Sequence, residues 1–174
     1  MEHLKKLVRT IPDFPKPGIQ FRDITTLLRH AEGFQESVDI MARYYQHDSI
    51  DVVAGVESRG FILGAPLALR LGVGFVPIRK PKKLPGKTIG VNYELEYGTD
   101  RLEIHTDAIA QGQRVLLVDD LLATGGTLKA ACQLIEEVGA VVCGCTCVIE
   151  LPDLKGRERL AGYPLFTLIS FEGE

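Results

Sequence analysis

The feature that most constrains this chain is an aliphatic run at residues 115–118, followed directly by Asp119 and Asp120 and then by a threonine–glycine turn at 124–127. An uninterrupted aliphatic run bounded by turn signals predicts a strand that is buried on both faces, as in a parallel sheet. We expect the two aspartates to end this strand. After the turn, apolar residues at helical spacing form one face, at Leu128, Ala131, Leu134, Ile135 and Val138. The sequence therefore predicts a strand that leads through a glycine turn into a helix.

Such a turn is typical of a site for a phosphorylated sugar. Glycines let backbone N–H groups approach a ligand closely, a helix N-terminus favours negative charge, and threonine hydroxyls add donors. Asp119 and Asp120 cannot bind the phosphate, because like charges repel. Their carboxylates suit the other half of the ligand, since they can accept hydrogen bonds from a ribose diol or hold water around a metal ion. The alternative interpretation is a purely structural strand, tight turn and capped helix.

The same order of elements recurs along the chain. Residues 50–56 predict a second buried strand, a polar turn at 57–60 ends it, and residues 61–71 predict a helix. Strands that alternate with helices indicate an α/β fold with a mostly parallel, twisted sheet flanked by helices. In such sheets, ligands bind beyond the carboxyl ends of the strands, where both turns are expected. Further strands are predicted at 73–78, 141–150 and 166–171, and further helices at 33–46 and 154–160.

Two segments allow more than one interpretation. Pro12, Pro15 and Pro17 predict an extended N-terminal arm without regular structure, which is either a packed tail or a functional segment. Residues 79–87 carry five basic side chains in nine positions. A charge run of this kind is either a solvated face or, with its prolines and glycine, an irregular lid that clamps several phosphate charges.

The roles of two acidic residues, Glu57 and Glu96, also allow two interpretations each. Glu57 and Arg59 are either a solvated pair or part of the ligand site. Residues 88–97 and 101–104 predict a β-hairpin around a glycine-containing turn. From spacing alone, Glu96 on this hairpin is either a solvated strand residue or a catalytic group.

Composition narrows the classes of protein. A length of 174 residues suits one globular domain, and a net charge of −3 argues against general nucleic-acid binding. We find no signal peptide and no run approaching the roughly 20 apolar residues of a membrane span, so we expect a cytoplasmic protein. Cys143, Cys145 and Cys147 alternate along a predicted strand, which would place them on one face. Without a CxxC pair or a nearby histidine, they are expected to be buried thiols rather than metal ligands.

Taken together, these motifs resemble those of the type I phosphoribosyltransferases, whose phosphoribosyl pyrophosphate motif has the Asp-Asp…Thr-Gly-Gly-Thr form. The resemblance covers nearly the whole chain and is strongest to the adenine-specific branch. Residues 21–24, Phe-Arg-Asp-Ile, resemble its hood over the base, and residues 95–98, Leu-Glu-Tyr-Gly, resemble its flap signature. The implied organisation is one phosphoribosyltransferase domain over 1–174, with an arm and hood at 1–32, a core at 33–174 and a flap at about 79–104.

This resemblance implies an activity. The protein is expected to be a pentosyltransferase of purine salvage, in which N9 of adenine displaces pyrophosphate from phosphoribosyl pyrophosphate to give AMP. Asp119 and Asp120 are expected to fix the ribose hydroxyls, and Glu96 to relay a proton from the base. Mg²⁺ is the implied cofactor, bound by substrate oxygens and water without direct protein ligands. A homodimer is also implied, with no nucleic-acid or membrane partner.

The resemblance assigns further residues to the substrates. Gln20 and Arg22 are placed near the purine. The turn that contacts pyrophosphate is expected to hold a cis peptide at Glu57–Ser58. The cations that match pyrophosphate contacts are Arg59, Arg79, Lys80 and Lys83. The residues expected around the 5′-phosphate are Ala123, Thr124, Gly125, Gly126 and Thr127, and the substrate-binding set is completed by Tyr97 and Leu121.

Two other functions are compatible with part of the pattern. One is a related transferase that uses guanine, hypoxanthine, xanthine or orotate, and the hood and flap segments argue against it. The other is a regulator that only binds phosphoribosyl pyrophosphate. Such a regulator would need a nucleic-acid surface or an added helix-turn-helix domain, and neither the length nor the charge supplies one.

Overall fold

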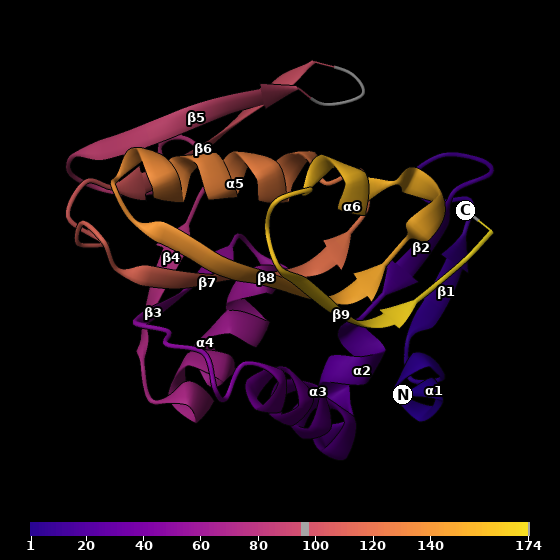
Figure 1. Ribbon diagram of the computed structural model, residues 1–174. Helices are drawn as coiled ribbons and strands as arrows, with labels where there is room; N and C mark the ends of the chain where they lie inside the picture. Colours follow the sequence, from indigo (N-terminus) through magenta and orange to yellow (C-terminus); the bar gives the residue numbers. More distant parts are fainter. Residues whose placement is uncertain (95–97, 174) are drawn as a thin grey trace.

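The computed structural model describes residues 1–94 and 98–173 and is built around one parallel sheet (Figure 1). The sheet has five strands in the order β4-β3-β7-β8-β9, and every neighbouring pair is parallel. The expected α/β fold with a mostly parallel sheet is confirmed. The strands are β3 (Val52–Val56), β4 (Gly74–Ile78), β7 (Arg114–Leu122), β8 (Val141–Glu150) and β9 (Leu165–Ser170).

Helices cover both faces of the sheet (Figure 1). On one face lie the N-terminal helices, and on the other lies α5 with the short helices that follow β8. The first group comprises α1 (Glu2–Lys5), α2 (Thr25–Arg29), α3 (Ala31–Tyr44) and α4 (Arg59–Leu71). The second comprises α5 (Gly126–Glu137), the 3₁₀ turn η1 (Pro152–Leu154) and α6 (Gly156–Arg159).

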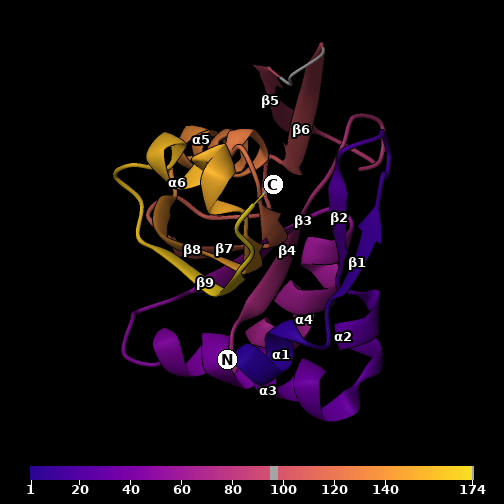
Figure 2. The ribbon, with the colours of Figure 1, turned by 90° about the vertical axis from the view of Figure 1, so that its right-hand side faces the viewer.

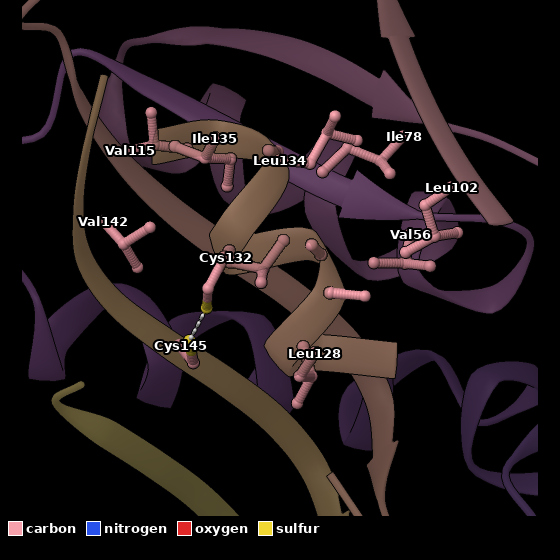
Figure 3. Packing of buried hydrophobic residues seen from close by; sticks show 14 of the residues in the cluster. Val56, Ile78, Leu102, Val115, Leu128, Cys132, Leu134, Ile135, Val142 and Cys145 are labelled. Carbon is pink, nitrogen blue, oxygen red and sulfur yellow. Dashed lines mark hydrogen bonds between the residues drawn. The ribbon is translucent and has the colours of Figure 1, made fainter. Parts of the chain in front are cut away.

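The central strand β7 explains why its sequence is aliphatic without interruption. Val115 and Leu117 belong to the core shared with α5, whereas Leu116 and Val118 belong to the core shared with α3 and α4. Successive side chains of a strand point to opposite faces, so a strand covered on both sides needs an apolar residue at every position. Figure 3 shows the α5 core, where Val115 lies beside Ile135.

β7 does not end at the aspartates, so that expectation was wrong. Asp119 pairs with Cys147, and the strand continues until Leu122 pairs with Glu150. The neighbouring strand β8 is ten residues long and offers ladder partners beyond the aspartates, which overrides their low strand propensity. The two carboxylates are therefore held on a paired strand instead of in a loop.

Two antiparallel hairpins project beside the sheet, one at the N-terminal arm and one at the expected flap (Figure 2). The arm is partly regular, against expectation. Its prolines fall at the end of the first strand and in the connecting turn, where a missing N–H breaks little of the ladder. The second hairpin is confirmed over its described residues. The strands are β1 (Arg9–Pro12), β2 (Gln20–Asp23), β5 (Thr88–Glu94) and β6 (Thr99–His105).

The cysteines of β8 do not share one face, which corrects the alternation argument. The register between β7 and β8 shifts at Val115 and Leu116, and Cys143 lies in the resulting bulge. Cys143 therefore packs against the α3–α4 core, while Cys145 and Cys147 lie in the α5 core. Cys145 Sγ lies 3.5 Å from Cys132 Sγ, and all four cysteines are free (Figure 3).

The described residues contain no group of three or more His, Cys, Asp or Glu side chains that could hold a metal ion. No helix in the described part of the chain has both the length and the apolar character that a membrane crossing requires.

Candidate functional site

The site lies at the carboxyl ends of β3 and β7, which pair in parallel and so end at the same edge of the sheet. The polar turn after β3 leads directly into α4, which begins at Arg59, two residues earlier than expected. A Cβ atom at Gly60 would lie 2.8 Å from the carbonyl oxygen of Val118. Only glycine allows this approach, and no local sequence signal identifies the need for it. The contact brings Arg59 beside the aspartates of β7.

The two aspartates have unequal surroundings. Asp120 is buried, and its Oδ2 accepts a hydrogen bond from Arg59 Nε at 2.5 Å. Asp119 has no such cation partner among residues 1–94 and 98–173, and its Oδ1 accepts the backbone N–H of Asp120 at 2.9 Å. Burial, followed by the charge of Asp120, raises the pKa of Asp119 well above its ordinary value. The site thus holds, side by side, one carboxylate paired with a cation and one whose charged form is disfavoured.

The glycine turn that follows β7 is shaped for close backbone approach. Gly125 has a φ of +79°, and a Cβ atom there would lie 2.6 Å from the carbonyl oxygen of Gly156. Helix α5 begins at Gly126, and no side chain in the described part of the chain makes a capping hydrogen bond at its N-terminus. Its first N–H groups therefore remain available to an anion.

The aspartates and the turn face one cavity of about 180 Å³, which we call the inner cavity. Each residue expected around the 5′-phosphate contributes to its wall, as does Leu121. The lining residues are Arg59, Asp119, Asp120, Leu121, Leu122, Ala123, Thr124, Gly125, Gly126, Thr127 and Leu128.

A second cavity of about 360 Å³, the outer cavity, shares Arg59, both aspartates and Thr127 with the inner one. It extends toward the cis peptide at Glu57–Ser58, which confirms the expected isomer. Its other lining residues are Val56, Glu57, Ser58, Lys80, Tyr93, Asp100 and Leu102. The two cavities together give a ligand space that runs from the glycine turn to the turn after β3.

Two of the expected cations reach this space through carboxylate partners. Arg79 Nε donates to Glu57 Oε2 at 2.8 Å, and Lys80 Nζ donates to Asp100 Oδ2 at 2.6 Å. The hydrogen bond to Asp100 raises the pKa of Lys80 above its ordinary value. Neither Arg79 nor Lys83 lines either cavity, but Arg79 is held by Glu57, which lines the outer one, whereas Lys83 is exposed. The structure thus brings Arg59, Arg79 and Lys80 together and leaves Lys83 apart.

Sequence reasoning missed Asp100 and Tyr93. The Tyr93 hydroxyl donates to Asp100 Oδ2 at 3.3 Å, and burial raises the pKa of this phenol. Both residues lie on the hairpin, opposite each other in its register. Tyr93 pairs with Asp100 because of the hairpin register. That register depends on the exact position of the turn, which the sequence pattern does not determine.

The remaining expected residues lie at the margin of the site or outside the described residues. Arg22 Nη1 donates to Thr10 Oγ1 at 2.7 Å, and neither Arg22 nor Gln20 lines the two cavities. Their neighbour Phe21 does reach the site, since the Arg59 guanidinium lies 5.8 Å from the centre of its ring. Glu96 and Tyr97 fall within residues 95–97, which are outside the described part of the chain.

Comparison with known proteins gives one consistent family. Residues 23–172 match the model of the phosphoribosyl transferase domain. The chain is 59% identical over 170 residues to adenine phosphoribosyltransferase of Chloroflexus aurantiacus, covering 98% of each protein. It is 56% identical over 171 residues to adenine phosphoribosyltransferase 4 of Arabidopsis thaliana, covering 98% of this chain and 94% of the relative.

A solved structure agrees over the whole fold. The crystal structure of adenine phosphoribosyltransferase from Thermoanaerobacter pseudethanolicus has a TM-score of 0.95 and 53% sequence identity to this chain. That match covers 98% of this chain and 99% of the other.

Proposed function

The chain belongs to the adenine phosphoribosyltransferase family, and we propose that the site at the ends of β3 and β7 performs the family's reaction with the residue roles given below. The enzyme transfers the 5-phosphoribosyl group from phosphoribosyl pyrophosphate to N9 of adenine, giving AMP and pyrophosphate in purine salvage. One observation carries the assignment of the site: Asp119, Asp120 and the turn at 123–127 face the same cavity.

The turn binds the 5′-phosphate. Support comes from the N-terminus of α5, where no side chain of the described residues makes a capping hydrogen bond, and from Gly125 and Gly126, which line the cavity without a side chain. Thr124 and Thr127 supply hydroxyl donors. Leu121 and Ala123 form the adjoining wall and keep the turn in place.

The two aspartates hold the ribose. Breaking the bond to pyrophosphate builds positive charge on the sugar ring and negative charge on the leaving group. An enzyme gains rate by matching this charge distribution better than it matches the substrates. Asp119 and Asp120 accept hydrogen bonds from the ribose hydroxyls, and their negative charge favours an oxocarbenium-like sugar.

The cations stabilise the departing pyrophosphate. Arg59, Arg79 and Lys80 are each paired with a carboxylate, on Asp120, Glu57 and Asp100 respectively. Phosphate oxygens form stronger charge-assisted contacts with such cations, so the substrate competes with these carboxylates when it binds. Lys83, which is exposed, joins the clamp from the lid, and Ser58 and Glu57 form the turn beneath it.

The base binds between hood and flap. Gln20 and Arg22 contact the purine, and the position of Phe21 beside Arg59 supports a hood that reaches the ligand space. Glu96 relays a proton from the base, and Tyr97 belongs to the substrate-binding set. Closure of clamp and flap keeps water from capturing the sugar.

Mg²⁺ is the proposed cofactor. The donor set near the ligand space fits an ion bound through water, because Asp120 is already paired with Arg59 and a hard cation keeps several waters. Asp119 and Asp120 would hold those waters, and the substrate's phosphate oxygens would complete the shell. When bound, the ion neutralises charge on the pyrophosphate.

We further propose that the chain forms one domain over 1–174, acts in the cytoplasm and assembles as a homodimer. The four free thiols suit a reducing compartment. An open groove of about 530 Å³ between α3 and α4 supports the dimer. Phe34, Val38 and Pro66 line it together with Leu69, whose side chain is 83% exposed. Nucleic acids and membranes are not proposed as partners.

The test is to incubate the pure protein with Mg²⁺, phosphoribosyl pyrophosphate and each base separately. Pyrophosphate release with adenine alone is the expected result. Release with guanine, hypoxanthine, xanthine or orotate instead would assign the protein to a related transferase. Binding of phosphoribosyl pyrophosphate without turnover on any base would contradict an enzymatic role.

A further inference from the structure

The short helix α6 lies directly against the glycine turn, although 28 residues lie between Thr127 and Gly156 in the sequence. A Cβ atom at Gly156 would lie 2.2 Å from the carbonyl oxygen of Ala123, and one at Gly125 would lie 2.6 Å from the carbonyl oxygen of Gly156. The two backbones therefore touch because both positions are glycine. Whatever fixes α6 in space also fixes the residues that it presents to the turn.

An ion pair between Arg157 of α6 and Glu150 at the end of β8 fixes α6 in place. Arg157 donates to Glu150 through Nε at 2.9 Å and through Nη2 at 2.5 Å, and Thr167 Oγ1 donates to the same carboxylate at 2.7 Å. Glu150 is buried, and its hydrogen bond with Arg157 lowers its pKa. Arg157 is thus engaged with β8 and β9 and is directed away from the turn.

Arg159, two residues further, has the opposite environment. Its Nη1 lies 3.2 Å from the position of a Cβ atom on Gly126, at the start of α5. It lines a cavity of about 360 Å³ together with Thr124, Gly126 and Lys129, which we call the α6 cavity. Within residues 1–94 and 98–173, its guanidinium has no hydrogen bond or ion pair, including none with Glu94 on the same cavity wall.

The 5′-phosphate needs such a cation. A phosphate monoester carries nearly two negative charges near neutral pH. The inner cavity offers it backbone N–H groups and hydroxyls. Among the described residues that line this cavity, Arg59 is the one cation; it is paired with Asp120, and Asp119 adds a further negative charge. The charge of the bound phosphate is therefore uncompensated unless a cation reaches the turn from outside that cavity.

We propose that Arg159 is a further substrate-binding residue, which contacts the 5′-phosphate at the turn from the α6 side. This inference rests on the proposed function and adds a residue that the turn motif at 123–127 does not contain. A guanidinium suits the role because its planar donors match two phosphate oxygens and its charge does not titrate. The Arg157–Glu150 pair and the Gly156 contact hold Arg159 in reach.

The test compares ligands with and without the phosphate. In Arg159→Gln, we expect the affinity for AMP to fall about tenfold and KM for phosphoribosyl pyrophosphate to rise about tenfold, as for loss of a charge-assisted hydrogen bond. Adenosine affinity and KM for adenine should stay unchanged. The AMP affinity of Arg159→Lys should lie between those of the wild type and Arg159→Gln, since lysine keeps the charge but loses the paired donors.

Lys129→Gln is the matched control. It removes the same charge from the same cavity, but the Lys129 ammonium lies over the Tyr163 ring at 4.7 Å from its centre. We expect AMP affinity to change by less than about twofold. Calorimetry measures both affinities, and a thermal melt checks that each variant folds.

Three results would overturn the role of Arg159: unchanged AMP affinity in Arg159→Gln, equal losses for AMP and adenosine, or an equal loss in Lys129→Gln. A wild-type protein that releases no pyrophosphate with adenine, yet loses AMP affinity on Arg159→Gln, would contradict the proposed function alone. Normal wild-type turnover with undiminished AMP binding in Arg159→Gln would contradict the inference alone.

Discussion

At the scale of single residues, Asp119 and Asp120 are adjacent on one strand and yet have different interaction partners. Asp120 gains Arg59 as a partner, while Asp119 is left with a backbone N–H and a neighbouring negative charge. A carboxylate in such surroundings holds its charge at a cost to the fold. This loss of stability has a catalytic counterpart, because the same negative charge attracts the positive charge that develops on the sugar ring in the transition state.

This cost predicts that Asp119→Asn stabilises the protein while it removes activity. The folded-state pKa of Asp119 is raised, so its stabilising contribution is complete below the ordinary value of 3.8 and is lost as the pH rises through the folded-state pKa. At neutral pH, burying Asp119 therefore costs the wild type stability, whereas asparagine, which cannot ionise but still accepts the Asp120 N–H, carries no such cost. We expect a gain of roughly 1 kcal/mol and a Tm higher by about 2–4 °C at pH 7.

Thermal unfolding of both proteins from neutral to acid pH measures this effect. The difference in Tm should shrink as the pH falls and disappear near the ordinary aspartate pKa. The same variant should lose at least about a hundredfold in kcat. A lower Tm at neutral pH would show that Asp119 stabilises the fold, and near-normal kcat would remove its role at the ribose.

The second residue-scale prediction concerns Glu96. Loss of a general acid–base group lowers the rate of proton transfer more than it weakens binding, so Glu96→Gln should reduce kcat by about 10²–10⁴ and change KM for adenine little. Glu94→Gln, two residues earlier in the sequence and exposed at the end of β5, is the control and should retain kcat. An unchanged kcat in Glu96→Gln would return Glu96 to the class of solvated hairpin residues.

At the scale of elements, a single substitution can test the close contact of α6 with the turn. In Gly156→Ala, the added methyl group cannot fit 2.2 Å from the Ala123 oxygen, so the turn or the helix must shift. We expect KM for phosphoribosyl pyrophosphate to rise and the free energy of unfolding to fall by about 1–3 kcal/mol. The control is Gly74→Ala, where the nearest atom to the added Cβ lies at 3.9 Å. Unchanged KM in Gly156→Ala would mean that α6 does not position the turn.

The elements also show what the sequence could and could not reveal. Aliphatic runs and glycine turns were enough for β3, β7 and α5, because those signals lie within one segment of chain. The extension of β7 to Leu122 depends on the length of β8, and the displacement of Cys143 depends on a bulge between strands. Such features arise from pairing across the sheet, which local periodicity does not encode.

The candidate site divides in the same way. The Asp-Asp and Thr-Gly-Gly-Thr segments could be read directly, since spacing and residue type carry their chemistry. Gly60, Asp100 and Arg159 could not, because each gains its role from a contact with a distant segment. The roles of Gln20, Arg22 and Glu96 remain predictions that rest on family resemblance.

At the scale of the whole molecule, the groove between α3 and α4 exposes apolar side chains among the polar residues Gln35, Asp39 and Arg70. Leu69 is 83% exposed beside the groove that Phe34 and Pro66 line, and Ile62 on the same helix is 44% exposed. A monomer rarely leaves such a patch in water. We expect light scattering to give a dimer for the wild type and a monomer for Leu69→Glu. Leu154→Glu, exposed elsewhere, should stay dimeric. A monomeric wild type would contradict the dimer.

The central claim is that the carboxylates of β7 and the glycine turn after it grip the two ends of one phosphorylated pentose. A crystal structure of the protein with bound AMP tests it most directly. We expect the phosphate to accept hydrogen bonds from the backbone N–H groups at 124–127 and the ribose hydroxyls to meet Asp119 and Asp120. A nucleotide bound elsewhere, with that turn empty, would contradict the claim.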